Sequence, residues 1–362
     1  MRVRDLGYLA VFLTAALPLE AWWLMRGGVA PDLAAWMPLA VIYGLVPLLD
    51  VLLGRDRSNP VDEAQAQRLD AQRWFRVLTW LCVPIWLALL VFCMKQITTL
   101  PLGPIGQLGW LLSTGTIGGV LAINVAHELI HKAGRLEPLL GGIALTSVGY
   151  FGFKIEHLRG HHVRVATPED VSSARLGESV YPFVLRALIH NPRAAWRLEV
   201  ERLQRRGLPP LSWHNEMLRW SLLWLLMLAA ATLWTGWAGA LFFIAQGIIA
   251  SATLEVINYV EHYGLRRVRD AQGRYERVTH LHSWNASQRL TNWLLFQLQR
   301  HSDHHAHARR RYQVLRHHAD SPQLPTGYAG MFVLALVPPL WRRVMDHRVR
   351  DFNARSAMPA QA

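Results

Sequence analysis

Six stretches of the chain consist almost entirely of apolar residues, and polar stretches separate them. They cover residues 6–25, 33–53, 77–94, 108–125, 218–235 and 239–257. A helix needs about 20 mostly apolar residues to cross the roughly 30 Å hydrocarbon layer of a bilayer. Trp side chains lie near the ends of several stretches, as they do at membrane interfaces. The pattern predicts an all-α integral membrane protein with about six transmembrane helices.

Two shorter apolar stretches, 139–153 and 328–341, have too few residues to span comfortably. We expect them to lie in the interface or to pack under the bundle. Long polar regions at 126–217 and 262–345 each begin where a span ends. No internal repeat or Gly/Ser-rich linker divides the sequence. The whole chain, residues 1–362, is therefore expected to form a single integral-membrane unit.

The distribution of positive charge predicts the orientation of these spans. Twelve Lys and Arg lie in residues 126–217, and four Arg lie in residues 54–73. The connections at 26–32 and 95–107 carry one basic residue each, and the turn at 236–238 carries none. Because basic loops stay on the cytoplasmic side, both termini and both long polar regions are expected there.

Composition narrows the class of protein further. Hydrophobic residues make up 52% of the chain and charged residues only 17%, against about 25% charged in an average soluble domain. This excludes a disordered or disulfide-rich secreted chain. The net charge of +13 is typical of a nucleic-acid-binding protein. However, the basic residues lie in the segments between the apolar stretches, and the sequence contains no nucleic-acid-binding module. We expect no nucleic-acid partner, and a basic face toward anionic lipid or an acidic protein.

Histidine is the residue type that carries chemistry here. The chain has 17 His but only two Cys, Cys82 and Cys93, which share one apolar stretch eleven residues apart. On a helix this separation is about 16 Å along the axis, too far for a disulfide. No thiolate metal site is expected, so any metal must be held by His or by carboxylates.

The histidines gather in four segments, all on the predicted cytoplasmic side: HELIH at 127–131, EHLRGHH at 156–162, EH at 261–262 and HSDHHAH at 301–307. On an α-helix, residues three or four apart share a face. Three sets are therefore each expected to point two or three imidazoles at one spot: His127 with His131, His157 with His161, and the trio His301, His304 and His305. The convergent set of nine is His127, His131, His157, His161, His162, His262, His301, His304 and His305. One four-coordinate metal cannot use nine imidazoles, whereas two metals can.

The other eight histidines are not expected to bind this metal. We place His190, His214, His317, His318 and His347 at the surface, and His280, His282 and His307 near the clusters.

Three kinds of protein remain compatible with these residues. HELIH alone is typical of a zinc protease with Glu128 as general base, but such a site needs one zinc and three protein ligands. A metal transporter would place its ligands at mid-membrane depth, and here they lie at one face. Two redox metals facing a membrane best suit oxygen chemistry on a lipophilic substrate, although imidazole itself suits Zn, Cu, Fe and Ni.

Four motifs carry a family resemblance: HELIHK at 127–132, EHLRGHH at 156–162, NYVEHYGL at 258–265 and LQRHSDHHAH at 298–307. Together they resemble the integral-membrane alkane hydroxylases (alkane 1-monooxygenases), within the wider superfamily of membrane non-haem di-iron enzymes. The resemblance covers most of residues 120–345. It implies that the nine histidines ligate two non-haem irons in the inner membrane of a bacterium, with the site on the cytoplasmic side.

The resemblance also implies a reaction. O2 would hydroxylate the terminal methyl group of an n-alkane taken from the bilayer, giving a primary alcohol and water. In the family the electrons come from rubredoxin, which a rubredoxin reductase reduces. This chain has no Cys after Cys93, so we expect a separate rubredoxin, steered to a basic surface that includes Arg309, Arg310 and Arg311. The alternative is hydroxylation or desaturation of a fatty acyl chain or an alkyl aromatic by the same superfamily.

Carboxylates that neighbour the candidate ligands are expected to support them. Glu128, Glu156, Glu261 and Asp303 each lie beside a ligand His in the sequence. Carboxylates in such positions often accept the imidazole N–H and fix its tautomer, and we expect this role rather than direct metal binding.

The substrate tunnel is expected to be lined by apolar side chains of the spans. Trp36, Val51, Trp80 and Trp86 are candidates, with lipid contact or ordinary packing as the alternative for each.

Overall fold

The computed structural model describes residues 3–356, and these residues form an all-helical fold. No strand occurs in this range; the extended segments make only three isolated bridges, Arg55 with Gln288, Arg269 with Tyr275 and Asn285 with Gln323. The predicted all-α class is therefore confirmed.

Five helical segments are long and apolar enough to cross a membrane: Gly7–Arg26, Pro31–Leu53, Arg73–Thr99, Pro104–Ile130 and Glu216–His262. The fifth corresponds to the last two predicted stretches. Gly236 lies between them with a φ of 67° and a ψ of −165°, a left-handed conformation that glycine adopts without steric cost. The long segment is thus two helical arms joined at a sharp kink.

These five segments are built from the following helices: η1 (Gly7–Ala10) and α2 (Val11–Arg26); α3 (Pro31–Ala34), α4 (Met37–Ala40), η2 (Val41–Leu45) and α5 (Val46–Leu53); α7 (Arg73–Thr99); α8 (Pro104–Gly118), η3 (Gly119–Asn124) and α9 (Val125–Ile130); and α14 (Glu216–His262). Segments η2 and η3 are π-helices. Isolated π-turns occur often at functional sites because they shift the side chains that follow.

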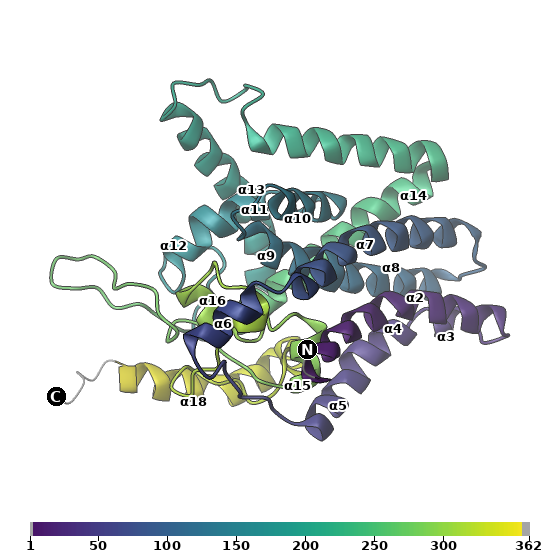
Figure 1. Cartoon of the computed structure of the whole chain (residues 1–362). Helices are drawn as coiled ribbons and strands as arrows, with labels where there is room; N and C mark the ends of the chain where they lie inside the picture. The colour runs from purple at the N-terminus through teal and green to yellow at the C-terminus, as the bar shows by residue number, and fades with distance from the viewer. Residues whose placement is uncertain (1–2, 357–362) are drawn as a thin grey trace.

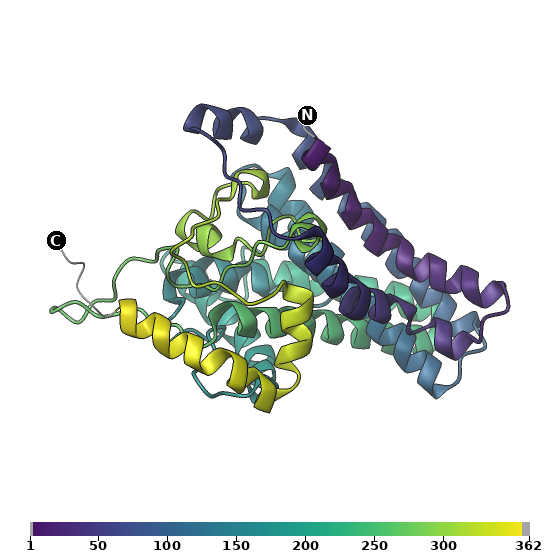
Figure 2. The same cartoon turned by 90° about the horizontal axis from the view of Figure 1, so that it is seen from below.

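Shorter helices make up the rest: α1 (Val3–Leu6), α6 (Glu63–Asp70), α10 (Leu136–Ser147), α11 (Phe153–Glu156), η4 (His157–His161), α12 (His162–Arg164), α13 (Val180–Gln204), α15 (Arg289–Leu294), α16 (His301–Ala306), η5 (Tyr312–Val314), α17 (Tyr328–Ala335) and α18 (Pro338–Ser356). The two short apolar stretches correspond to α10 and to α17 with the start of α18. In Figures 1 and 2 the apolar helices extend together to one side, and α12, α16 and α18 lie toward the other.

Two of the apolar helices continue past their predicted ends. We expected spans to stop at residues 125 and 257, but α9 runs to Ile130 and α14 runs to His262. The polar side chains in these last turns, including His127 and His262, are buried by neighbouring segments. The helices therefore carry candidate ligands on their own final turns.

Close packing fixes the helices that carry the site. Trp86 of α7 is fully buried and donates its indole N–H to Ser147 Oγ of α10 at 2.8 Å. A Cβ at Gly118 of α8 would lie 2.9 Å from this indole ring, so only glycine lets the two helices approach so closely.

Helix α18 holds the end of α14 in place. Its buried side chains Trp341, Met345 and Val349 recur every four residues, the spacing of one helix face. Its polar side contacts the turn after α14, because Tyr263 donates a hydrogen bond to Asp346 at 2.6 Å. The C-terminal helix thus fixes the position of neighbouring His262.

Candidate metal centre

Nine histidine rings meet at the polar end of the bundle, and they come from four segments far apart in the sequence. His127 lies on α9 with His131 just after it, His157, His161 and His162 lie on η4 and α12, His262 ends α14, and His301, His304 and His305 lie on α16. The structure therefore brings together all nine histidines that the sequence singled out.

The rings form two adjoining groups. Within each group, one ligand atom from every side chain lies within 4.8 Å of the others. The first group contains His127, His131, His157, His162 and His304, and the second contains His161, His262, His301 and His305. The groups touch each other, since the ring centroids of His162 and His305 are 4.4 Å apart.

The expected pairing of His157 with His161 is wrong, because residues 157–161 form the π-helix η4. A π-turn aligns residues five apart instead of four. His157 and His162 accordingly share the first group, whereas His161 turns to the second. One extra residue in this turn lets a single segment serve both groups.

Ring nitrogens converge closely in the first group. The Nε2 atom of His157 lies 3.0 Å from Nε2 of His131 and 3.0 Å from Nε2 of His162. The Nε2 atom of His162 also lies 3.1 Å from that of His304. Four rings from three segments therefore direct the same nitrogen toward one point.

The second group repeats this arrangement and includes a carboxylate at its edge. His301 Nε2 lies 3.2 Å from His262 Nε2 and 2.9 Å from His305 Nε2. Glu261 Oε2 lies 3.2 Å from the same His301 nitrogen. Helix α16 thus divides its histidines, with His304 in one group and the other two, four residues apart, in the second.

The environment keeps most of these rings neutral. Burial, assisted by the neighbouring imidazoles, lowers the pKa of His131, His157, His162, His301, His304 and His305 well below the ordinary value. Neutral imidazole is the form that offers a lone pair to a metal.

Asp170 is a buried partner of the second group that sequence reasoning missed. Its Oδ2 lies 2.9 Å from His161 Nδ1 and also accepts a hydrogen bond from Ser173 Oγ at 2.6 Å. Burial disfavours charge on the His161 ring, but the carboxylate outweighs this and raises the pKa of His161. Asp170 lies nine residues beyond the histidine, in the loop after α12. No helical spacing connects the two, although the serines that follow it are typical of a local turn.

Two of the four carboxylates predicted beside ligands contact other groups. Glu128 of α9 pairs with Lys132 Nζ, just past the end of that helix, at 2.9 Å. Asp303 accepts hydrogen bonds from Arg310 and from His318 Nε2, both at 2.8 Å. Each carboxylate therefore balances a basic side chain instead of an imidazole of the two groups.

Glu156 has a third kind of environment. It is 1% exposed, and within residues 3–356 neither of its carboxylate oxygens has a hydrogen-bond partner. Burial first, and then the charge of Asp170, raise the pKa of Glu156 to about 8. This environment disfavours the charged carboxylate, whereas we expected a carboxylate that accepts an imidazole N–H.

A third set of possible ligands lies nearer the surface, formed by His280, His318 and Asp320. The two rings stack with centroids 4.3 Å apart and planes only 16° from parallel. Lone pairs lie in the plane of an imidazole, so stacked rings do not aim them at a shared point. His318 Nε2 is moreover bonded to Asp303. This set lacks the convergence of the two main groups.

The three arginines after the last histidine segment are largely engaged inside the protein. Arg310 pairs with Asp303 at 2.8 Å, and Arg311 pairs with Glu137 at 2.7 Å. Only Arg309 has an exposed side chain. The expected basic surface formed by all three is therefore weaker than the sequence suggests.

The two histidine groups fit a pair of metal ions. Neutral rings whose Nε2 atoms face one another at about 3 Å repel unless a proton or a cation lies between them. The Nε2 atoms of His127 and His161 are buried, and among the described residues they have no hydrogen-bond partner. An all-imidazole ligand set suits Fe, Zn, Cu or Ni. The arrangement can therefore hold two such ions side by side.

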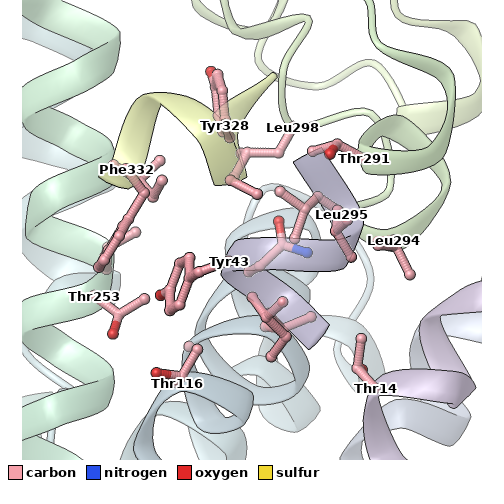
Figure 3. A pocket seen from close by; sticks show the side chains of 18 residues that line it. Thr14, Tyr43, Thr116, Thr253, Thr291, Leu294, Leu295, Leu298, Tyr328 and Phe332 are labelled. Carbon is pink, nitrogen blue, oxygen red and sulfur yellow. The ribbon is translucent and has the colours of Figure 1, made fainter. Parts of the chain in front are cut away.

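An apolar cavity, here called the inner cavity, lies among the helices, with Tyr43, Leu298 and Tyr328 in its lining (Figure 3). Asn124, Ile257 and Leu298 line it, and each lies three to five residues before a ligand histidine. Tyr328 also lines it, and burial and the charge of Glu261 raise the pKa of this phenol. The cavity therefore reaches the edge of the second group.

None of the expected tunnel residues lines this cavity within the described chain. Trp86 packs in the core against Ser147, and Val51 is 75% exposed on the outer surface of α5. Trp36 donates its indole N–H to Ile105 O at 3.1 Å. The alternative roles in packing or in contact with lipid describe these three side chains better.

Comparison with known proteins gives consistent matches over nearly the whole chain. The family model for fatty acid desaturases matches residues 102–335. An alkane 1-monooxygenase 2 from Pseudomonas aeruginosa is 51% identical over 359 residues, covering 98% of this chain and 94% of its own. An alkane 1-monooxygenase 2 from Alcanivorax borkumensis is 46% identical, and the match covers 97% of this chain and 92% of that protein. The hydroxylase component of a xylene/toluene monooxygenase from Pseudomonas putida is 29% identical, and the match covers 90% of this chain and 85% of that protein.

Proposed function

The chain belongs to the alkane 1-monooxygenase family, within the desaturase-like membrane enzymes, and we propose that it hydroxylates the terminal methyl group of n-alkanes at two non-haem irons. The observation that carries the proposal is the pair of adjoining all-histidine groups beside an apolar cavity. The nine proposed iron ligands are the members of those groups.

The proposed reaction consumes O2 and two electrons. One oxygen atom enters the C–H bond of the methyl group, and the other leaves as water after uptake of two protons and two electrons. When bound, the iron pair supplies the activation of O2. The protein's own task is to position the substrate and the ligands, as in other cofactor enzymes.

An alkane offers no polar group for recognition, so the shape of the inner cavity must orient it. Asn124, Ile257 and Leu298 line the cavity close to the ligands in the sequence, which supports a pose with one methyl end toward the histidine groups. A hydrophobic pocket discriminates one methylene by only about 1–3 kcal/mol. We therefore propose that the enzyme accepts a range of chain lengths.

We propose a separate rubredoxin, reduced by its reductase, as the electron donor, since Cys82 and Cys93 are both buried in α7 and are not arranged to hold a rubredoxin iron. We also propose that the chain is one multi-pass unit in a bacterial inner membrane. The concentration of Lys and Arg in residues 54–73 and 126–217 favours a cytoplasmic site, where soluble donors are present.

An alkyl aromatic is the second candidate substrate, because of the similarity to a xylene/toluene monooxygenase component. A fatty acyl substrate fits less well. It carries a polar or charged end, and no Lys or Arg of the described chain lines the inner cavity. The apolar lining favours a hydrocarbon.

Product analysis tests the proposal. Membranes containing the full chain, supplied with rubredoxin, its reductase, NADH and ¹⁸O2, should convert an n-alkane to the 1-alcohol with one labelled oxygen. The variant His301→Ala should insert normally but form no alcohol, and His347→Ala, on the exposed side of α18, serves as the matched control. Product formation without O2, or by the His301→Ala variant, would contradict the assignment.

A further inference from the structure

A second apolar hollow, here called the outer groove, lies on the surface of the helix bundle. Tyr181 and Leu185 of α13 and Val333 of α17 line it, and these side chains are 58%, 61% and 41% exposed. The lining of the inner cavity, by contrast, is mostly buried, as at Thr14 and Leu298. One hollow opens outward among apolar helices, and the other ends beside the histidine groups.

The two hollows share one wall. Tyr43, Thr116, Thr253 and Phe332 line both of them. The rings of Tyr43 and Phe332 stack with centroids 4.5 Å apart and planes 20° from parallel. Figure 3 shows the Tyr43 hydroxyl directed toward the two threonines. This shared set of residues is the barrier between the outer groove and the inner cavity.

The barrier presents little polarity to a hydrocarbon. Thr253 donates its hydroxyl to Ile249 O of its own helix at 2.9 Å, so its hydroxyl is satisfied within α14. The aromatic rings supply most of the remaining surface. An alkyl chain that crosses here therefore meets the aromatic faces of Tyr43 and Phe332.

The two rings come from separate elements of the fold. Tyr43 lies on the π-helix η2, and Phe332 lies on the eight-residue helix α17. Isolated π-turns within a helix often mark functional positions. No space for an alkyl chain remains between rings stacked at 4.5 Å, so passage requires the rings to turn apart.

We propose that Tyr43 and Phe332 form the threshold through which an alkane passes from the outer groove into the inner cavity, and that this pair selects unbranched chains. The inference rests on the proposed function for the identity of the substrate. A bilayer fills the outer groove with alkyl chains, and the threshold admits those whose narrow methyl end can slide between the rings.

Substrate preference gives the first test. The variants Tyr43→Ala and Phe332→Ala should raise kcat/KM for a branched or ring-bearing alkane, relative to the n-alkane, by roughly tenfold. Phe92→Ala is the matched control, because Phe92 packs on Trp22 and Trp110 and lines neither hollow. An unchanged ratio in both threshold variants, or an equal change in the control, would overturn the proposal.

Labelling gives a second test that needs no turnover. A diazirine-bearing n-alkane in liposomes should label the outer groove near Leu185 and the inner cavity near Leu298. Phe332→Trp should reduce inner labelling about tenfold and leave outer labelling unchanged. If labelling near Leu298 is the same in Phe332→Trp as in the wild type, the alkane enters the inner cavity by another route.

The tests separate the two proposals. If the wild-type chain labels as expected but forms no alcohol, the proposed function fails and the threshold stands. If alcohol forms normally and the threshold variants change neither labelling nor preference, only the threshold is refuted.

Discussion

Replacing Asp170 by Asn should loosen one metal of the pair and leave the other in place. Among the nine histidines, Asp170 hydrogen-bonds only to His161, and His161 belongs to the second group. The carboxylate accepts from His161 Nδ1 at 2.9 Å, from Ser173 Oγ at 2.6 Å and from Ser172 N at 3.2 Å. Three donors therefore point at two oxygens.

An amide cannot serve all three donors, because its nitrogen is itself a donor. At least one hydrogen bond is lost, and the negative charge facing the His161 ring is lost in every orientation. Loss of such an outer partner typically lowers metal affinity about tenfold to a hundredfold, which corresponds to roughly 1.4–2.8 kcal/mol. No histidine of the first group hydrogen-bonds to Asp170, so that group should largely keep its affinity.

Chelator challenge of purified, iron-loaded protein measures this difference. In Asp170→Asn, one iron per chain should leave about tenfold or more faster than in the wild type, and the second should leave at the wild-type rate. Asp32→Asn is the matched control, because Asp32 accepts a hydrogen bond from Gly103 N in a loop between apolar helices. Wild-type release of both irons from Asp170→Asn would refute the reasoning, and so would equal acceleration of both.

Two further substitutions test the scaffold. Burial alone would raise the pKa of Glu199, but hydrogen bonds from Arg202 and Arg159 lower it from 4.5 to about 2. The charged Glu199 therefore stabilises the folded chain above about pH 4.5, and this contribution is lost as the pH falls toward 2. Glu199→Gln should therefore lower the free energy of unfolding by about 1–3 kcal/mol near pH 7. The difference in melting temperature between this variant and the wild type should shrink as the pH is lowered toward 2. A difference that stays constant with pH would contradict the lowered pKa of Glu199. A Cβ at Gly247 would lie 2.5 Å from Val148 O, so Gly247→Ala should destabilise the chain by about 1–3 kcal/mol. Denaturation of the detergent-solubilised protein measures this loss. Unchanged stability would show that α14 can shift to make room for the methyl group.

The apolar stretches and the histidine segments were predictable because each depends on local sequence. Stretches of about 20 apolar residues are constrained by bilayer thickness, and histidines three or four apart suggest a common target on any helix. The kink at Gly236 falls in the predicted turn at 236–238. Sequence alone thus located the candidate ligands and the helices that carry them.

The division of the ligands between two groups was not predictable from spacing. It depends on the π-helix η4, in which His157 aligns with His162 instead of His161. A π-turn leaves no clear mark on the pattern of apolar residues. Neighbouring segments stabilise it, so only the assembled fold reveals which rings face each other.

Carboxylates adjacent in sequence were also poor guides to contacts in space. Glu128 and Asp303 balance Lys132 and Arg310, because a residue beside a ligand on a helix points about 100° away from it. Asp170 reaches His161 through a loop. Such long-range pairs follow from tertiary packing, which sequence spacing does not encode.

The metal content of the purified chain tests the central claim most directly. Elemental analysis of detergent-solubilised wild-type protein should find about two irons per chain and little zinc. His301→Ala, which removes one of four ligands from the second group, should fold and should lose iron. One zinc per chain, or full iron content in His301→Ala, would contradict the two-iron site.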